Sequence, residues 1–176
     1  MLFRSRVFVG TDANEFYALD ADSGRTEWKW RVGGDVIGAA VDAEDHVFIA
    51  SLDNLLRSVN RGNGNQRWRR PIPARPAVPP RAIKDVVLLT GVAPQLTLYA
   101  AKDGREISTF ASPAELEGAP LVDGAMTPFK VAIVVITREG QAIGLFPVAA
   151  LFREPPTAPL QELPGTRLGR EPSPAS

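Results

Sequence analysis

The chain repeats itself at a step of about 40 residues, and this constrains its fold more than any other feature. Three short apolar runs stand in one register, and they are Val7–Val9, Val47–Ile49 and Val87–Leu89. One glycine per copy keeps the same step, at Gly24, Gly64 and Gly104. A looser fourth copy includes the apolar run Val131–Ile136. A repeat of this length buries its apolar side chains only by stacking on its neighbours.

Each copy alternates apolar and polar residues with a period of two. In the segment 26–32, Trp28 and Trp30 fall on one side, while Glu27, Lys29 and Arg31 fall on the other. This alternation is typical of β-strands. Clusters of Asp, Asn and Gly mark turns between the alternating segments. Four short strands in about 40 residues, repeated along the chain, predict an all-β fold of about four β-propeller blades.

The first copy resembles the repeat of pyrroloquinoline-quinone-type propellers. Its matching segments are Val7–Thr11, Phe16–Arg25 and Trp28, which include the run Tyr-Ala-Leu-Asp and a glycine turn. The resemblance covers about residues 6–146. The repeat is also similar to that of the outer-membrane-assembly propeller lipoproteins. It implies that five residues dock adjacent blades, namely Trp28, Trp68, Gly24, Gly64 and Gly104. The third copy has Ser108 at the tryptophan position.

The resemblance also sets the phase of the blades, because the glycine turn and tryptophan belong to the last strands of a blade. We then expect three strands near 6–11, 15–20 and 26–32, and complete blades near 36–72 and 76–111. A last blade has strands near 118–122, 131–137 and 141–146, without a clear fourth strand. Two complete and two incomplete blades predict an arc of a larger propeller, since an open arc leaves unpaired edges. Three ways of closing the ring stay open. The chain could close as a four-bladed ring, missing blades could complete a larger ring, or the chain could self-associate with a second copy.

Composition changes near the end of the repeats. Seven prolines fall from Pro147 onward, and the alternation stops. We therefore predict two parts, a propeller over residues 1–150 and a flexible, Pro-rich tail over residues 151–176.

Bulk composition excludes several classes of function. Lys plus Arg and Asp plus Glu both number 20, which does not favour a nucleic-acid partner. No apolar run approaches the ~18 residues of a membrane helix, and the chain has no Cys for disulfides or thiolate metal sites. No apolar leader follows Met1, so the chain as it stands is expected in the cytoplasm, whereas the resemblance implies the periplasm or cell envelope.

One stretch departs from this charge balance. Between Asn54 and Lys84 the chain has eight basic residues and no acidic one, whereas residues 12–53 contain ten acidic residues. We predict a basic patch for a protein partner, made of Arg57, Arg61, Arg67, Arg69, Arg70 and Arg75, with Arg81 and Lys84 nearby. An ordinary solvated face or charge pairing between blades is the alternative.

No catalytic, cofactor-binding or metal-binding residue is assigned. His46 takes the place that Arg6 has in the first copy, which indicates a solvated strand end. The run Asp20–Gly24 begins like a calcium loop, but Arg31 stands where a twelfth-position Glu is needed. The leading hypothesis is a non-enzymatic protein-binding scaffold with no cofactor. The alternatives are a portion of a quinone-dependent oxidoreductase and a sensor domain of a larger protein.

Overall fold

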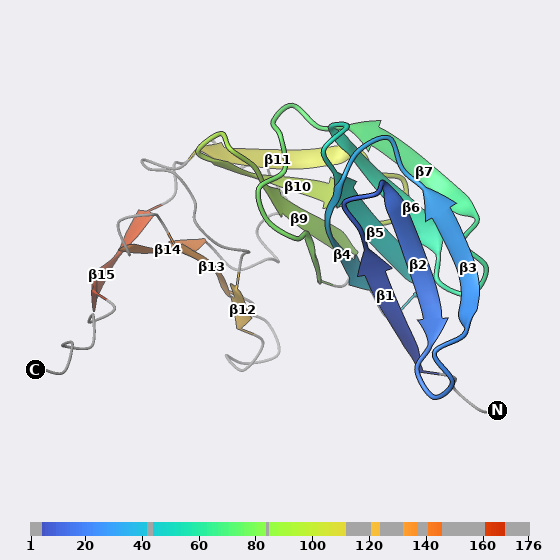
Figure 1. Ribbon diagram of the computed structural model, residues 1–176. Helices are drawn as coiled ribbons and strands as arrows, with labels where there is room; N and C mark the ends of the chain where they lie inside the picture. The colour runs from blue at the N-terminus through green and yellow to red at the C-terminus, as the bar shows by residue number, and fades with distance from the viewer. Residues whose placement is uncertain are drawn as a thin grey trace, which may run out of the picture.

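The computed structural model describes residues 5–41, 44–83 and 85–111 in full, and four later strands by their backbone. All regular structure in this described part is β-strand. Four separate antiparallel sheets follow one another in chain order, from the blue sheet at one end to the orange sheet at the other (Figure 1).

The sheets are simple meanders, and we number them as blades. Blade 1 contains β1 (Arg6–Gly10), β2 (Glu15–Asp20) and β3 (Thr26–Arg31). Blade 2 contains β4 (Val36–Val41), β5 (His46–Ser51), β6 (Leu55–Asn60) and β7 (Gln66–Pro71). Blade 3 contains β8 (Arg81–Ile83), β9 (Val86–Thr90), β10 (Gln95–Ala100) and β11 (Glu106–Ala111). Blade 4 contains β12 (Leu121–Asp123), β13 (Ala132–Ile136), β14 (Gln141–Leu145) and β15 (Gln161–Arg167).

The repeat step is confirmed strand by strand in blades 1 to 3. The equivalent strands β1, β5 and β9 begin at Arg6, His46 and Val86. Even the irregularity in strand pairing recurs, because each of these blades shifts register once between its last two strands. The shifts fall at Ala18/Leu19, Ser58/Val59 and Leu98/Tyr99. One sequence pattern therefore builds the same local geometry three times.

Apolar side chains between adjacent blades form the core. Phe16 of blade 1 packs in one cluster with Val47 and Ile49 of blade 2. Phe48 and Trp68 of blade 2 pack in a second cluster with Val87 of blade 3. Blades 1 and 2 therefore each direct an aromatic face toward the β-branched face of the following blade.

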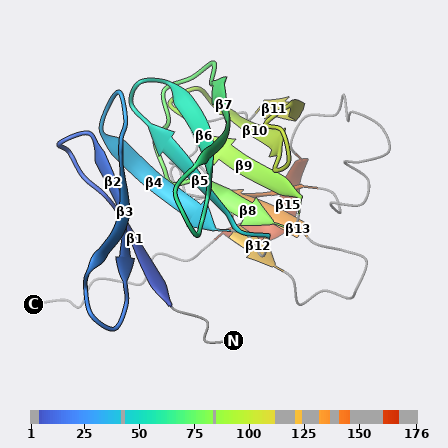
Figure 2. The ribbon, with the colours of Figure 1, turned by 90° about the vertical axis from the view of Figure 1, so that its right-hand side faces the viewer.

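The first strands of blades 1 to 3 lie close together along one side. β4 contacts both β1 and β8 across the blade boundaries, and Figure 2 shows these strands running next to one another. β8 has three residues where β4 has six. Pro76, Pro79 and Pro80 precede it, and because proline has no N–H to donate, they shorten the ladder.

Blade 4 corrects one expectation. Strand β15 pairs with β14 as a fourth strand, although no fourth strand was expected, and it lies within the predicted tail. Its sequence contains Pro164-Gly165 and lacks regular apolar alternation, which is why the pattern did not reveal it. The rest of the predicted tail lies outside the described residues, so the boundary at residue 150 stays a prediction.

Candidate functional site

Two tryptophans reach from one blade into a turn of the next. The indole Nε1–H of Trp28 on β3 donates to the carbonyl oxygen of Arg61 at 3.1 Å. That of Trp68 on β7 donates to the carbonyl oxygen of Ala101 at 2.8 Å. Both acceptors lie 33 residues further along the chain, in the turn that follows the third strand of the next blade. The two contacts are therefore the same contact, repeated.

The glycine of the receiving turn provides the space for the indole. Gly64 has φ +72° and Gly104 has φ +70°, in the left-handed region that favours glycine. A Cβ built on Gly64 would lie 2.8 Å from the ring of Trp28, and one on Gly104 would lie 2.5 Å from the ring of Trp68. This is the arrangement that docking of adjacent blades requires, and the docking role of these residues stays a prediction.

The first member of the glycine series is different. Gly24 has φ +68°, but no described atom lies within 4 Å of the position of its Cβ. Its turn thus has the receiving geometry without an indole against it.

The basic patch is smaller than the sequence suggested. Arg57 is buried, and its guanidinium pairs with the carboxylate of Asp53, so it cannot contribute to an exposed surface. A buried charge of this kind needs a partner of opposite sign. Counting charge along the sequence did not show the inward orientation of Arg57.

Three further arginines of the predicted patch have partners. Arg61 Nη2 lies 3.2 Å from Asp45 Oδ1. Arg67 Nη1 donates to His46 Nε2 at 3.1 Å. Arg70 Nη2 donates to the carbonyl oxygen of Asp103 at 2.7 Å, and so reaches the same turn of blade 3 that receives Trp68. The contacts of these three arginines fit the alternative interpretation of the basic stretch, in which its residues pair within and between blades.

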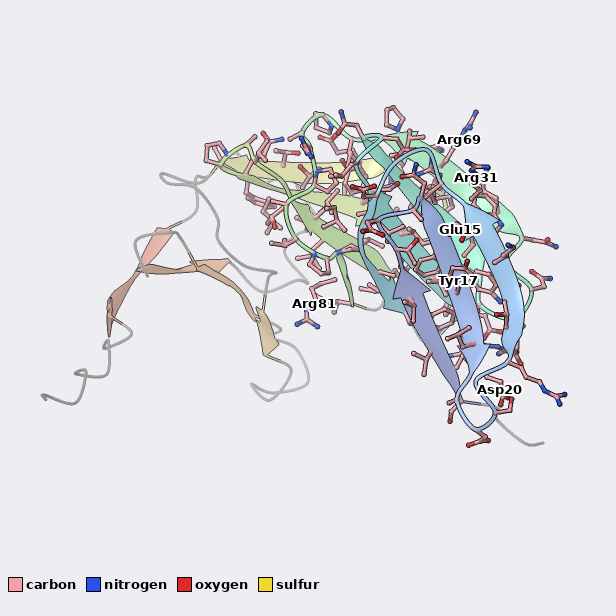
Figure 3. All side chains as sticks on the ribbon, in the orientation of Figure 1. Glu15, Tyr17, Asp20, Arg31, Arg69 and Arg81 are labelled. Atoms are coloured by element: carbon pink, nitrogen blue, oxygen red, sulfur yellow. The ribbon has the colours of Figure 1, made fainter. Side chains whose placement is uncertain are left out.

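Arg69 and Arg75 are exposed, as are Arg67 and Arg70. Arg31 on β3 is also exposed, and Figure 3 shows Arg31 and Arg69 directed outward from β3 and β7. Arg81 points away from the sheets in the same view, and Lys84 lies outside the described residues.

His46 is a correction to the expectation of a solvated strand end. Its side chain is buried, with its ring 5.5 Å from that of Phe48 at an angle of 22° between planes. The guanidinium of Arg67 on β7 lies beside it. The exchange of Arg6 for His46 between copies was therefore a poor guide to exposure.

A partly buried polar network that sequence reasoning missed joins blades 1 and 2. Arg57 Nη1 donates to Ser51 Oγ at 2.7 Å and to Asp53 Oδ1 at 3.1 Å. Ser51 Oγ donates to Asp53 Oδ1 at 2.7 Å, and the backbone N–H of Gly33 donates to Asp53 Oδ2 at 3.2 Å. Gly33 follows β3, so this carboxylate ties the end of blade 1 to the turn between β5 and β6. In the sequence, Asp53 stands four residues before Arg57 across a short turn, and this spacing could have predicted their ion pair.

The network controls the ionisation of Asp53. Burial alone raises the pKa of this carboxyl, but the hydrogen bonds from Arg57 and Ser51 outweigh it, so the pKa lies below its usual value. The carboxylate is thus held in its charged form, as an acceptor for the donors around it.

Tyr99 is buried at the boundary between blades 2 and 3. It lines a small cavity with Ile72, Leu89 and Thr97, and its hydroxyl has no hydrogen-bond partner among the described residues. Burial raises the pKa of Tyr99 to about 12, with a smaller effect from the charge of Glu106. The cavity is too small for an organic ligand.

No group of three or more His, Cys, Asp or Glu side chains in the described part of the chain is placed to hold a metal ion. Among the same residues, no helix is long and apolar enough to cross a membrane. Asp20, the first residue of the run resembling a calcium loop, accepts hydrogen bonds from Ser23 N and Ser23 Oγ at 2.8 and 2.7 Å. These bonds make Asp20 part of an ordinary turn.

Residues 2–81 match the family model described as outer membrane protein assembly factor BamB. The resemblance to the quinone-type propeller repeat is confirmed. The outer membrane protein assembly factor BamB of Yersinia pestis is 30% identical over 64 residues, which are 36% of this chain and 16% of that protein. The chain therefore spans a small part of this curated relative.

Solved structures agree on the fold. BamB from Moraxella catarrhalis superposes with a TM-score of 0.66 at 14% identity, over 79% of this chain and 42% of that one. BBS1N, solved in complex with ARL6DN, superposes with a TM-score of 0.68 at 17% identity, over 80% of this chain and 44% of that one. At these identities the likeness concerns the fold alone, and it confirms the β-propeller. The chain spans less than half the length of each of these structures.

Proposed function

We propose that the chain is a non-enzymatic, protein-binding propeller that acts in outer-membrane protein assembly in the bacterial cell envelope. The match of residues 2–81 to the BamB family model carries this proposal. The most organised polar groups in the described part have structural explanations. Ser51 and Arg57 hold the carboxylate of Asp53, which accepts the N–H of Gly33 from blade 1. Asp20 closes a turn.

The contact surface would lie on the outer strands of the blades. Arg69 on β7 and Arg75 after it are exposed, and Arg31 on β3 extends the positive charge to blade 1. Exposed arginines attract an acidic partner over about a Debye length, roughly 8–10 Å at physiological salt. Their effect falls mainly on the rate of association and on its dependence on salt.

The likeness to BBS1N supports a protein partner for a fold of this kind, since that propeller was solved in complex with ARL6DN. Blade edges and outer strands offer a rigid surface, which lowers the entropic cost of binding. For this chain the proposed partner is an envelope protein with an acidic segment.

A photo-crosslinking experiment tests the proposal. A photoreactive phenylalanine replaces Arg69 in the chain, and the matched control replaces Arg105, which is exposed in the turn before β11. After illumination in bacterial cells, the expected result is a covalent adduct at position 69 with one outer-membrane assembly protein. The same adduct at both positions, or none at position 69, contradicts the proposed surface.

Two further measurements sharpen this test. Arg69→Glu with Arg75→Glu should lower the affinity for the captured protein at least about tenfold, whereas Arg105→Glu should leave it unchanged. Titration with pyrroloquinoline quinone plus calcium should leave the absorbance spectrum of the quinone unchanged. Stoichiometric uptake of the quinone contradicts the non-enzymatic assignment.

A further inference from the structure

Two arginines face each other on neighbouring strands of blade 2. Arg57 on β6 lies directly opposite Arg69 on the outer strand β7. Side chains at directly opposite positions share one face of a sheet, and like charges there are destabilising. The carboxylate of Asp53 pairs with Arg57, whereas Arg69 is exposed and forms no ion pair with any described residue.

Blades 1 and 3 satisfy the residue at the same place in the repeat. In blade 1 this residue is Lys29, and its Nζ lies 3.7 Å from Oε1 of Glu15. In blade 3 it is Thr109, whose hydroxyl oxygen lies 3.3 Å from the hydroxyl oxygen of the opposite residue on β10. Where blade 1 has Glu15, blade 2 has Leu55. Blade 2 therefore lacks the carboxylate that would serve Arg69.

Unneutralised positive charge continues along β7. Arg67 and Arg70 are exposed beside Arg69, and Figure 3 shows Arg69 directed outward from this strand. The partners of the other two arginines are not carboxylates. Arg67 Nη1 donates to His46 Nε2 at 3.1 Å, and Arg70 Nη2 donates to the backbone carbonyl oxygen of Asp103 at 2.7 Å. Among the described residues, no carboxylate forms an ion pair with any of these three guanidinium groups.

The backbone of Arg69 is directed to the open edge of blade 2. β7 is the last strand of its sheet, and blade 2 lies between blades 1 and 3 along the chain. The N–H of Ile72 donates to the carbonyl oxygen of Asn54 at 2.9 Å, and hydrogen-bonded pairs alternate along an antiparallel ladder. This alternation makes Arg70 and Leu56 a hydrogen-bonded pair, so the N–H and C=O of Arg69 turn away from β6.

A side-chain contact agrees with this orientation. Arg70 Nη1 donates to the carbonyl oxygen of Arg69 at 3.3 Å, on the side that β6 does not cover. A carbonyl oxygen has two lone pairs, so this oxygen retains one for a further donor. The edge at Arg69 thus offers a backbone donor, a backbone acceptor and a cationic side chain together.

An extended acidic peptide fits this combination. A strand added to an edge satisfies its unpaired backbone groups, and its side chains then lie beside those of the edge strand. A carboxylate beside Arg69 would relieve the repulsion from Arg57. A second copy of β7 would instead bring the same arginines against these. Single-stranded nucleic acid stacks its bases on aromatic rings, but Trp68, the aromatic residue of β7, is only 7% exposed.

We propose that β7 is a strand-addition site for an extended acidic segment of a protein partner. The added strand pairs with the backbone N–H and C=O of Arg69, and one of its carboxylates binds the guanidinium of Arg69. Arg67 and Arg70 attract the neighbouring carboxylates. This inference rests on the proposed function, because it states how the acidic partner would bind.

A synthetic peptide tests the proposal on the full chain. The probe alternates glutamate and valine over about eight residues, within the usual length of a strand, and carries a fluorophore. One control probe has a methyl group on every backbone nitrogen, which keeps the charge but removes the ladder donors. The other control probe has glutamine in place of glutamate, which keeps the ladder but removes the charge. Fluorescence anisotropy should show the original probe binding at least about tenfold more tightly than either control.

A variant of blade 2 tests the site without removing an arginine. Leu55→Glu places a carboxylate where blade 1 has Glu15, so that Arg69 gains the internal partner that Lys29 has. It should weaken binding of the original probe at least about tenfold, because the internal carboxylate competes with the peptide. The matched control Gln95→Glu makes the same change at the equivalent place in blade 3 and should leave the affinity unchanged. Arg69→Gln, at an exposed position, should weaken binding as Leu55→Glu does, and it keeps the test valid if Leu55→Glu does not fold.

Three results would overturn the proposal. Equal binding of the methylated and original probes would mean that charge alone attracts the peptide. Unchanged binding of the original probe to Arg69→Gln would place the site elsewhere. Single-stranded DNA that binds as tightly as the original probe, and is weakened equally by Arg69→Gln, would assign the edge to nucleic acid.

These results are separate from the test of the proposed function. If an envelope protein is captured by crosslinking but the methylated probe binds as well as the original, the proposed function stands and strand addition is wrong. If the probes and variants behave as expected but no envelope protein is captured, the β7 site stands and the assignment to outer-membrane assembly is wrong.

Discussion

At the scale of single residues, the receiving glycines offer a built-in comparison. Gly24, Gly64 and Gly104 share a left-handed φ, at +68°, +72° and +70°, but only Gly64 and Gly104 have an indole against them. Alanine in this conformation costs about 1–2 kcal/mol at any of the three positions. At Gly64 and Gly104 the added methyl also collides with the ring, at a further cost of about 1–3 kcal/mol.

We therefore expect Gly64→Ala and Gly104→Ala to lower the free energy of unfolding clearly more than Gly24→Ala does. Urea denaturation followed by tryptophan fluorescence measures this difference. Equal losses of unfolding free energy for Gly24→Ala and Gly64→Ala would mean that the indole contact does not require a glycine at position 64.

The partly buried carboxylate of Asp53 makes a second prediction at this scale. Asp53→Asn leaves the buried guanidinium of Arg57 without its anionic partner, which typically costs about 3–5 kcal/mol. The matched control is Asp12→Asn, an exposed carboxylate in a turn. Chemical denaturation at neutral pH should show a large loss for Asp53→Asn and almost none for Asp12→Asn.

The same carboxylate makes stability depend on acid. Because the folded pKa of Asp53 is lowered, its contribution is present above the ordinary pKa of an aspartate, about 3.9, and is lost as the pH falls through the folded pKa. Asp53→Asn should therefore flatten the fall in stability below about pH 4. An unchanged acid limb in this variant would show that other carboxylates control it.

Tyr99 predicts an effect at the opposite end of the pH range. Its pKa is raised to about 12 by burial, so the folded protein keeps it neutral where the unfolded chain ionises it. Its contribution to stability is present below about pH 10, the ordinary pKa of tyrosine, and is lost as the pH rises toward 12. In a Tyr17→Phe variant, ultraviolet titration of the folded chain should show Tyr99 ionising near 12. Ionisation at the ordinary pKa would place the hydroxyl in water.

At the scale of strands and turns, the repeat predicted more than the individual residues did. The repeat step located β1, β5 and β9 and the hairpins that follow them, because alternation and turn residues are local signals. It did not predict the shortness of β8, which follows from three prolines, or the strand β15, whose sequence contains Pro-Gly. Pairing of a strand with a distant partner is a tertiary effect that local pattern does not contain.

The tryptophan contacts predict unequal costs for one substitution. Trp68→Phe keeps an aromatic ring in the cluster but leaves the carbonyl of Ala101 without its indole donor, which costs about 1–3 kcal/mol. Trp30→Phe is the control, since Trp30 packs in the neighbouring cluster and makes none of these contacts with a receiving turn. The unfolding temperature should fall more for Trp68→Phe. A larger loss for Trp30→Phe would place the main interaction between blades elsewhere.

At the scale of the whole molecule, the sequence located the candidate surface only in part. The basic stretch is real, but exposure differs along it, because Arg57 is buried on the inner strand β6 while its cross-strand partner Arg69 on the outer strand β7 stays exposed. Packing likewise buries His46, although its position in the repeat suggested solvent. The burial of a charged residue depends on what covers it in the fold, and that information is not in the charge pattern.

The central claim is that blades 1 to 3 form one series, in which each blade covers the branched apolar face of the next and blade 1 remains uncovered. Hydrogen exchange of the original chain, resolved by strand, tests it most directly. The amides of β5 and β9 should be the slowest to exchange, and those of β1 should exchange much faster, because β1 has an unpaired edge and exposed Val7 and Val9. A monomeric chain in which β1 is as protected as β5 would contradict the account.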